Sequence, residues 1–321
     1  MISRSSLVIG GPAVVTFASA TIFTQSPVVV RLRPETFPVK VDGLGTLDER
    51  LKNVIAEISF TPAGEVEAAA VTAFFPHLNP SIGRTAFPNL VAAPNDVVIQ
   101  EIFSPYRKYT IYNAIVFKQP ELILSAEKTV FGQVTLHALG ADNTAWTDAA
   151  KFYKVETGST PDLTALSVSA IKTVTYTMAV GALSAPWNAV ETKDGIKVSL
   201  DVPLQPRGTD SGGTIDYMYG EGASARLSFT PTNVTPANVL DLMLMQSTGA
   251  ARGASIDGKR YAVAIAGGST NLAVTVNNCL LRALPMKHSA DADVVDELEF
   301  VSYRHLTTGT MDALAAISIA S

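Results

Sequence analysis

The chain has 321 residues, of which 47% are hydrophobic and 17% charged. This balance is typical of a folded protein and argues against disorder, and the length fits two domains of about 150–160 residues each. The net charge of −5 provides no basic field for phosphates, which argues against a tight nucleic-acid binder but leaves room for a surface past which DNA slides. Cys279 is the single cysteine, so an intrachain disulfide is excluded. We expect this side chain to be buried and to pack as a small hydrophobic residue.

The N-terminal segment has the outline of a secretory signal. Arg4 precedes an apolar run from Leu7 to Phe17, and small residues follow at 18–20. Because Gly10-Gly11-Pro12 interrupts that run, we do not expect a signal peptide. No apolar stretch reaches the roughly 20 residues of a membrane span either. We therefore expect a soluble protein that folds in a cytoplasm.

Short strand-like segments of the first half recur in the second half in the same order. The matched pairs, first copy before second, are Val30 and Val198, Leu32 and Leu200, Pro38 and Pro206, Gly45–Asp48 and Gly213–Asp216, Ile58–Pro62 and Leu227–Pro231, Asn113 and Asn278, Pro120 and Pro285, and Ser125–Glu127 and Ser289–Asp291. The offset is 168 residues at first and shifts only in loop-like stretches. An ordered series of this kind indicates that one module is written twice in tandem.

The matched segments are rich in β-branched residues and are separated by Pro, Gly and Asn, a pattern typical of short strands. We therefore expect a mainly β fold with two tandem β-barrel or sandwich modules, at residues 1–155 and 186–321, joined by a connecting segment at 156–185. Residues 34–56 and 202–225 alternate polar and apolar side chains around a turn. They predict a long projecting hairpin arm in each module, whose strand edges serve for docking.

Each module also contains one amphipathic helix pattern. In the first, Ala70, Ala73 and Phe74 share a face with Val66, and Pro76 ends the helix. In the second, Thr235 is the expected N-cap and Pro236 the first helical residue. The face expected to be apolar there consists of Val239, Leu240, Met243 and Leu244.

Candidate chemistry is sparse. The four histidines lack metal-ligand spacing, and we expect loop, surface or interface positions for His77, His137, His288 and His305. An acidic run lacks the glycine and spacing of a calcium loop and is expected to be a solvated face; it comprises Asp291, Asp293, Asp296, Glu297 and Glu299. We therefore expect no catalytic residue, no metal ligand and no enzyme activity.

The glycine-rich segments do not fit a nucleotide site. Gly10-Gly11-Pro12, Gly208–Gly213 and Gly267-Gly268 lack the strand-to-helix context of a phosphate-binding loop, so we expect no cofactor. Gly222–Arg226 departs from the nucleophile elbow, because Arg226 replaces its last glycine. Trp146 and Trp187 leave open a β-sandwich module that binds glycans or a receptor.

One stretch carries a resemblance to a known family. Tyr109–Ala114, Pro120, Ser125–Leu136 and Asn143–Trp146 are similar to the tail tube proteins of long-tailed bacteriophages, a fold shared with the inner tube of type VI secretion systems. Gly10-Gly11-Pro12-Ala13 resembles the entry strand of those proteins. The resemblance implies a β-barrel with a flanking helix and a long arm, whose inner strands join around a pore.

Most members of that family carry one module and form hexamers, whereas this chain carries two. The resemblance therefore implies a homotrimeric ring with pseudo-sixfold symmetry, and rings that stack into a DNA-conducting tube of the virion, assembled in the cytoplasm of a bacterial host. Implied partners are further copies of the chain, the terminator, tape-measure, distal tail or sheath proteins, and DNA in transit without specific binding. A hub or distal tail protein at the tail tip is the alternative within the same class.

Overall fold

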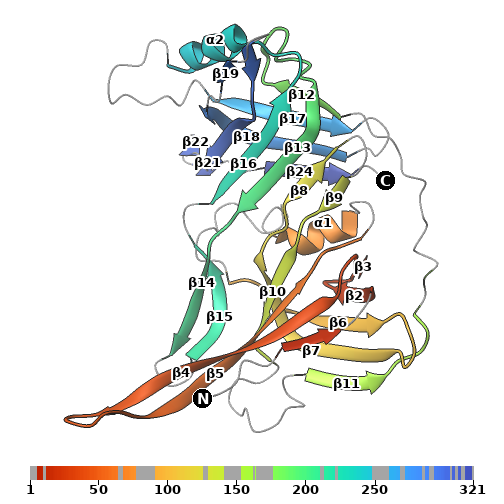
Figure 1. The fold of residues 1–321 in the computed structure, drawn as a ribbon, viewed down its shortest axis with the longest axis vertical. Helices are drawn as coiled ribbons and strands as arrows, with labels where there is room; N and C mark the ends of the chain where they lie inside the picture. Colours follow the sequence, from red (N-terminus) through yellow and green to blue (C-terminus); the bar gives the residue numbers. More distant parts are fainter. Residues whose placement is uncertain are drawn as a thin grey trace.

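The fold is described from a computed structural model. The residues described are 6–9, 12–63, 68–76, 91–125, 129–140, 153–161, 163, 176–209, 213–220, 223–247, 260–267, 272–283, 286–288, 293–303, 306–307, 310–311 and 315–319. Over this part of the chain the structure is mainly β, as expected, with its strands in antiparallel sheets. Two large sheets follow one another along the long axis of the molecule (Figure 1).

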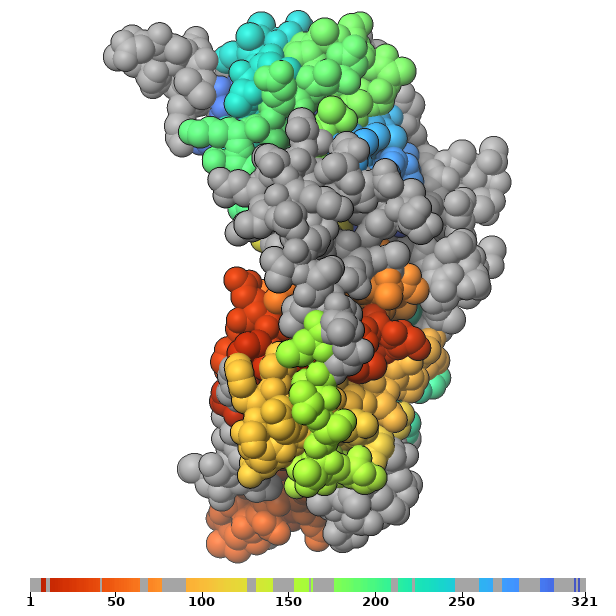
Figure 2. All heavy atoms as spheres, turned by 90° about the vertical axis from the view of Figure 1, so that its right-hand side faces the viewer, coloured from red at the N-terminus to blue at the C-terminus, as the bar shows by residue number. Residues whose placement is uncertain are grey.

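The first large sheet has nine strands in the described part of the chain. They are β1 (Ser6–Ile9), β2 (Ala13–Phe17), β3 (Ala20–Phe23), β4 (Val28–Val41), β5 (Gly45–Phe60), β6 (Asn95–Glu101), β7 (Arg107–Lys118), β10 (Val134–Ala138) and β11 (Tyr153–Thr157). Their order is β1-β4-β5-β10-β7-β6-β2-β3, and β11 pairs with β7 outside this path. Figure 2 shows β11 in light green against the orange strands of this half.

The second large sheet also has nine described strands. They are β8 (Leu122–Leu124), β9 (Thr129–Phe131), β12 (Tyr176–Val180), β13 (Thr192–Asp201), β16 (Ser224–Pro231), β17 (Tyr261–Gly267), β18 (Leu272–Ala283), β21 (Leu298–Tyr303) and β24 (Ala315–Ile319). Their order is β12-β17-β18-β21-β16-β13-β8-β9, and β24 pairs with β18. Two members, β8 and β9, come from the first half of the chain.

The two large sheets share one strand order. Six consecutive strands of the first sheet, β4-β5-β10-β7-β6-β2, correspond to β13-β16-β21-β18-β17-β12 in the second. The matched residues Val30 and Val198 lie in the corresponding strands β4 and β13. Asn113 in β7 and Asn278 in β18 both have a positive φ, of 55° and 56°. Asparagine tolerates that conformation better than other side chains, so the repeat extends to the backbone of matched residues.

Two helices are described, one for each half. Helix α1 (Ala68–Phe74) buries Ala70, Ala73 and Phe74 as expected, while Val66 lies outside the described residues. Helix α2 (Pro236–Ser247) begins as expected after Thr235, whose hydroxyl accepts a hydrogen bond from the backbone N–H of Asn238 at 3.3 Å. That bond satisfies one of the free donors at a helix start.

The apolar face expected for α2 was partly wrong. Val239 and Leu242 are fully buried, whereas Leu240 is 46% and Leu244 61% exposed. The helix contacts β18 and β20 (Asp293–Val295). In this position the side of the helix with Val239 and Leu242 faces the core. The helical periodicity was predicted correctly, but the direction of the buried stripe depends on the position of the helix on the sheet.

Both expected arms are hairpins, but the expectation that both project was wrong for the second, which packs on the first half. The first is the outer part of β4–β5, whose pairing continues to Val41 and Gly45 at the tip, and it projects from the molecule (Figure 1). The second is a separate two-stranded sheet of β14 (Leu204–Thr209) and β15 (Gly213–Tyr219). Two further two-stranded sheets are described, formed by β19 (Met286–His288) with β20 and by β22 (Leu306–Thr307) with β23 (Thr310–Met311).

Nearly all of the described buried apolar residues, from both halves, form one continuous cluster. Near α1, the Phe74 and Phe131 rings meet edge to face, with centroids 5.2 Å apart. Since Phe131 belongs to β9 of the second sheet, α1 packs where the two sheets meet. In the second half, Trp187 packs edge to face on Phe300 at 6.4 Å. The two halves therefore share one hydrophobic core.

Candidate assembly interface

A hairpin of the first half completes the sheet of the second half. Leu122, Ile123 and Leu124 of β8 pair antiparallel with Val198, Lys197 and Ile196 of β13, and β9 pairs on the outer side of β8. This membership departs from the expected division at residues 155 and 186, because residues 122–131 lie in the second sheet. Each non-proline residue offers the same backbone N–H and C=O groups, so local sequence does not specify which sheet edge a short strand completes.

The hairpin is held by burial on one face. Leu122 and Leu124 have no exposed surface, and Phe131 is 3% exposed. Burial of each leucine side chain contributes about 1.5–3 kcal/mol. Ile123 points to the other face and is half-buried. Side chains of a strand alternate between the two faces of a sheet. Leu122 and Leu124 therefore lie on the buried face of the second sheet, and Ile123 lies on the accessible face.

Two local features help the hairpin to fit. The Ser199 hydroxyl donates a hydrogen bond to the Glu121 carboxylate at 2.9 Å. Gly195 has a φ of +87°, and a Cβ atom placed there would lie 2.5 Å from the carbonyl oxygen of Leu124. Any other residue would therefore be strained and would push the hairpin away at this point.

The second arm, β14–β15, belongs to the second half and packs on the first half. Thr214 of β15 donates two hydrogen bonds to the Glu35 carboxylate, from its backbone N–H at 2.9 Å and from its hydroxyl at 2.8 Å. The Asn53 side-chain amide donates a hydrogen bond to the carbonyl oxygen of Thr214. Further along β15, the Ala92 N–H donates to the Tyr217 carbonyl at 2.8 Å. The halves thus exchange elements in both directions.

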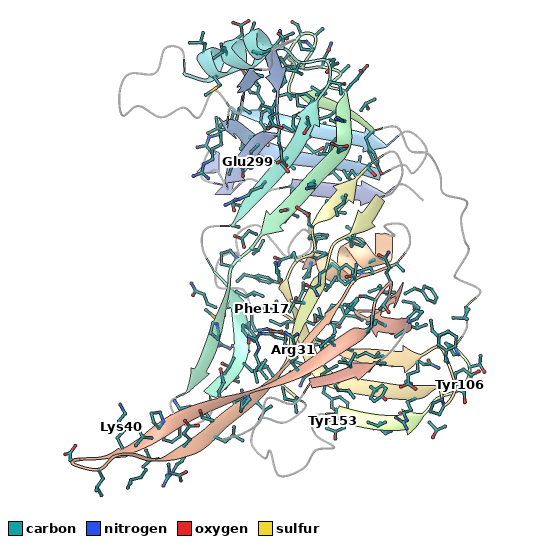
Figure 3. The ribbon with its side chains drawn as sticks, viewed as in Figure 1. Arg31, Lys40, Tyr106, Phe117, Tyr153 and Glu299 are labelled. Atoms are coloured by element: carbon teal, nitrogen blue, oxygen red, sulfur yellow. The ribbon has the colours of Figure 1, made fainter. Side chains whose placement is uncertain are left out.

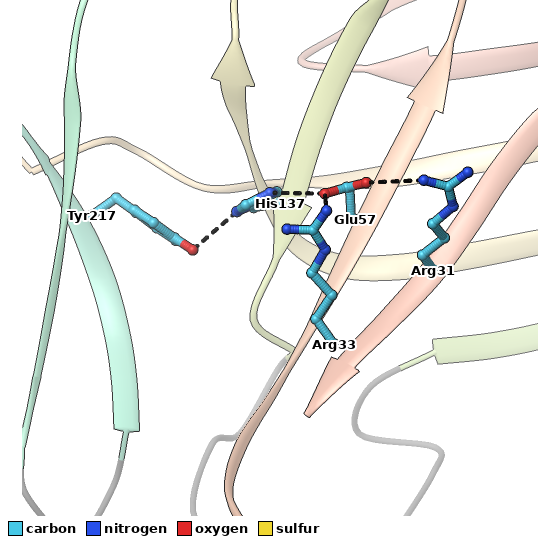
Figure 4. Close-up of polar contacts among 5 residues, drawn as sticks. All are labelled: Arg31, Arg33, Glu57, His137 and Tyr217. Carbon is cyan, nitrogen blue, oxygen red and sulfur yellow. Dashed lines mark hydrogen bonds and ion pairs between the residues drawn. The ribbon is translucent and has the colours of Figure 1, made fainter. Parts of the chain in front are cut away.

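A polar cluster lies at the base of the arms, where β4, β5, β10 and β15 approach one another (Figure 4). The Glu57 carboxylate contacts Arg33, is 3.9 Å from the Arg31 guanidinium and 3.7 Å from His137 Nε2. His137 Nδ1 and the Tyr217 hydroxyl are 3.0 Å apart, within hydrogen-bond distance. Only Tyr217 comes from the second half, so this bond joins the two halves.

The titration of this cluster is dominated by burial. Desolvation lowers the pKa of His137 to about 4, with Arg33 acting in the same direction and Glu57 opposing it. The ring is therefore neutral at pH 7, and its contact with Glu57 is not an ion pair. Phe117 stacks on it with centroids 3.6 Å apart. Desolvation also raises the pKa of Tyr217 to about 12. Neither group is poised to exchange protons near neutral pH.

A cavity of about 630 Å³ lies beside the joint between the hairpin and the second arm. Phe117, Gln119, Glu121, Gly132 and residues 199–204 are among its lining. The Gln119 amide nitrogen is buried and has no hydrogen-bond partner in the described part of the chain. The Ser199–Glu121 hydrogen bond lies in the cavity wall and links the hairpin to β13, so the cavity belongs to the joint between the halves.

The remaining candidate residues lie apart from one another in the structure. Cys279 is fully buried, as expected, and desolvation raises the pKa of its thiol to about 12. Trp187 is 4% exposed and packs in the core, so its ring is not presented to a glycan. His288 lies in β19. The following residues lie outside the described part: Gly10, Gly11, His77, Trp146, Gly212, Gly222, Gly268, Asp291 and His305.

The acidic run is divided by the fold. Asp293 lies in β20, Asp296 and Glu297 follow it, and Glu299 lies in β21, 3.6 Å from the Arg226 guanidinium. Figure 3 shows Glu299 on the second sheet, far from Arg31 and Phe117 at the arm base. Among the described residues no three potential metal ligands come together. None of the described helices has the length and apolar character needed to cross a membrane.

The sequence does not match any family model, and no curated protein matches it. The main feature missed from the sequence is the exchange of β8–β9 and β14–β15 between the halves. One available signal was Leu122-Ile123-Leu124 between Pro120 and Ser125, a short fully apolar run typical of a strand buried within a sheet.

Proposed function

We propose that this chain is the subunit of a bacteriophage tail tube, in which three chains form a ring of six tube-like modules. The observation that carries the proposal is the completion of the second sheet by the β8–β9 hairpin of the first half. Its donor and acceptor are different surfaces, so the contact is heterologous. Repeated between copies, such a contact generates a closed ring or a filament.

The tandem arrangement supports a trimer. Within one chain the first half donates a hairpin to the second half, and the second half donates an arm to the first. The β8–β9 contact uses one donor hairpin and one acceptor edge. Each chain therefore keeps the corresponding hairpin, β19–β20, at its second half, and the corresponding edge, that of β4, which β1 covers, at its first half. Three chains joined through those surfaces would form a ring of six similar modules with threefold symmetry.

The projecting first arm supports stacking of rings. Leu44 and Leu47 near its tip are 71% and 59% exposed, and Lys40 lies out along the arm (Figure 3). Exposed apolar residues on a strand edge favour pairing with another chain, and soluble monomers normally avoid them. In the proposed tube the arm contacts the neighbouring ring.

The charge of the chain suits a conduit for DNA. A chain with a net charge of −5 has no overall basic field to retain phosphates, which supports passage of DNA without specific binding. The proposed location is the virion. The terminator, tape-measure, distal tail or sheath proteins are the proposed partners at the ends and faces of the tube.

Electron microscopy of the purified protein tests this proposal. Negative-stain images should contain rings or tubes with a central pore, and class averages should have threefold symmetry with six similar modules. Light scattering should give a ring mass of three times 33.9 kDa. A strictly monomeric protein at every concentration would contradict the proposal. Trimeric rings that never stack would instead favour the hub or distal tail position.

A further inference from the structure

We infer that the outer edge of β4 is the docking site for the β19–β20 hairpin of a second copy of this chain, and that β1 occupies this edge until the second copy docks. The inference rests on the proposed ring and names the residues that would close it. It also assigns a regulatory role to the N-terminal strand, because β1 and the incoming hairpin compete for one edge.

The edge of β4 is the repeat counterpart of the edge that β8 occupies. On β13, Val198, Lys197 and Ile196 face Leu122, Ile123 and Leu124. The counterparts of these three acceptor residues, 168 positions earlier, are Val30, Val29 and Val28. They face Leu7, Val8 and Ile9 of β1, also antiparallel. Therefore β1 lies in the same register and direction as the hairpin strand β8.

The fit of β1 is less complete than that of β8. Leu122 and Leu124 are fully buried, whereas in β1 Ile9 is buried but Leu7, the counterpart of Leu122, is 46% exposed. A second strand, β9, covers the outer side of β8, but in the described part of the chain no strand pairs with the outer side of β1. The edge of β4 can thus accept a larger and better-covered partner than β1.

The β19–β20 hairpin is the repeat counterpart of β8–β9. Met286 pairs with Val295, Lys287 with Val294 and His288 with Asp293. In β8–β9 the pairs 164 residues earlier are Leu122 with Phe131, Ile123 with Val130 and Leu124 with Thr129. The two hairpins have identical internal register. Yet β19–β20 forms a two-stranded sheet of its own among the described residues, so β19 retains an edge for pairing.

Competition for β4 makes assembly depend on concentration. The exchange of β1 for β19 replaces one set of ladder hydrogen bonds with another, so this part contributes little net free energy. The exchange gains the burial contributed by β20, which pairs on the outer side of β19, whereas in the described part of the chain no strand pairs on the outer side of β1. Because β1 is tethered to β4, its effective concentration is on the order of millimolar. The strand therefore holds the chain as a monomer until copies accumulate.

Cysteine pairs test the docking register. Lys287→Cys with Val29→Cys should give covalent dimers and trimers after mild oxidation, since this pair corresponds to Ile123 and Lys197. Ile123→Cys with Lys197→Cys is the matched control and should form a disulfide within the monomer. The native Cys279 is retained because it is fully buried. The single variant Lys287→Cys should give no covalent dimers or trimers.

A second pair tests the role of β1. Val8→Cys with Val29→Cys should lock β1 onto β4 when oxidised and raise the concentration required for assembly by at least about tenfold, an effect reversed by reduction. Both side chains are accessible to solvent in part, so the lock should not disturb the core. Val8→Pro, which weakens the β1 ladder, should lower that concentration by a similar factor, and Val8→Thr should not change it.

The outcomes separate this inference from the proposed function. Rings that form without cross-links between residues 29 and 287, while the 123–197 control forms its disulfide, would overturn the docking register and leave the ring intact. Locked protein that assembles as readily as reduced protein would overturn the role of β1. A wild-type protein that never forms oligomers would contradict the proposed function and this inference together.

Discussion

His137 is a neutral, buried histidine that connects the two halves through one hydrogen-bond contact. Its ring lies between Phe117, Glu57 and Tyr217, and Arg33 is close enough to disfavour protonation further. A charged ring would remain beside Glu57 but would lose solvation and face Arg33. Protonation is therefore unfavourable in the folded state, and the residue links stability to pH.

The sign of this linkage predicts destabilisation by acid. The folded-state pKa is about 4 and an unfolded histidine has about 6.5, so the unfolded chain binds a proton first as the pH falls. The contribution is negligible above pH 7 and grows between pH 6.5 and 4. At pH 5 it should lower the free energy of unfolding by about 2 kcal/mol relative to pH 7.

Urea denaturation at both pH values measures this effect. Other groups also titrate in this range, so the comparison is with His137→Gln, a polar side chain that does not ionise. The variant should lose about 2 kcal/mol less between pH 7 and pH 5 than the wild type. An equal loss in both proteins would show that His137 does not carry the pH dependence.

The two arms are matched elements with different surroundings. Gly213 begins β15 and Gly45 begins the outer part of β5, and both have a positive φ. A Cβ atom at Gly213 would lie 2.7 Å from the Asn53 Cβ and 2.8 Å from a Glu35 carboxylate oxygen. At Gly45 the same atom would meet nothing within 4 Å. One arm is docked and the other is free at the corresponding position.

Alanine at each of these glycines should separate backbone strain from docking. Gly45→Ala should cost about 1–2 kcal/mol from the unfavourable φ alone. Gly213→Ala should cost about 1–3 kcal/mol more, because the added carbon also displaces Asn53 and Glu35. Urea denaturation gives the stabilities, and amide hydrogen exchange in β15 reports release of the arm. Equal costs at both sites would contradict the docked geometry.

At the scale of the whole molecule, the exposed tip of the first arm should matter for assembly and not for folding. Leu44→Ser with Leu47→Ser should change the free energy of unfolding by less than about 0.5 kcal/mol, because both side chains are exposed. The same variant should form rings but few tubes in electron micrographs. Phe103→Ser, at another exposed apolar residue (66%), is the control and should form tubes normally. Unchanged tubes in the arm variant would rule out this role.

Much of the local structure was predictable. The start of α2 after Thr235, the end of α1 before Pro76 and the hairpin arms follow from capping chemistry and alternation, which act over a few residues. The matched Asn113 and Asn278 share a left-handed backbone for the same local reason. The polar cluster was not predictable, because Glu57, His137 and Tyr217 come from three strands distant in the sequence.

The sequence by itself determined the β-rich class, the repeated order of strands and the presence of one helix in each half, since periodicity and turn residues encode these directly. Only the tertiary structure decided that β8–β9 completes the second sheet and that β14–β15 packs on the first half. Strand pairing relies on backbone groups common to all residues, so the acceptor edge is selected by shape and burial in the folded molecule.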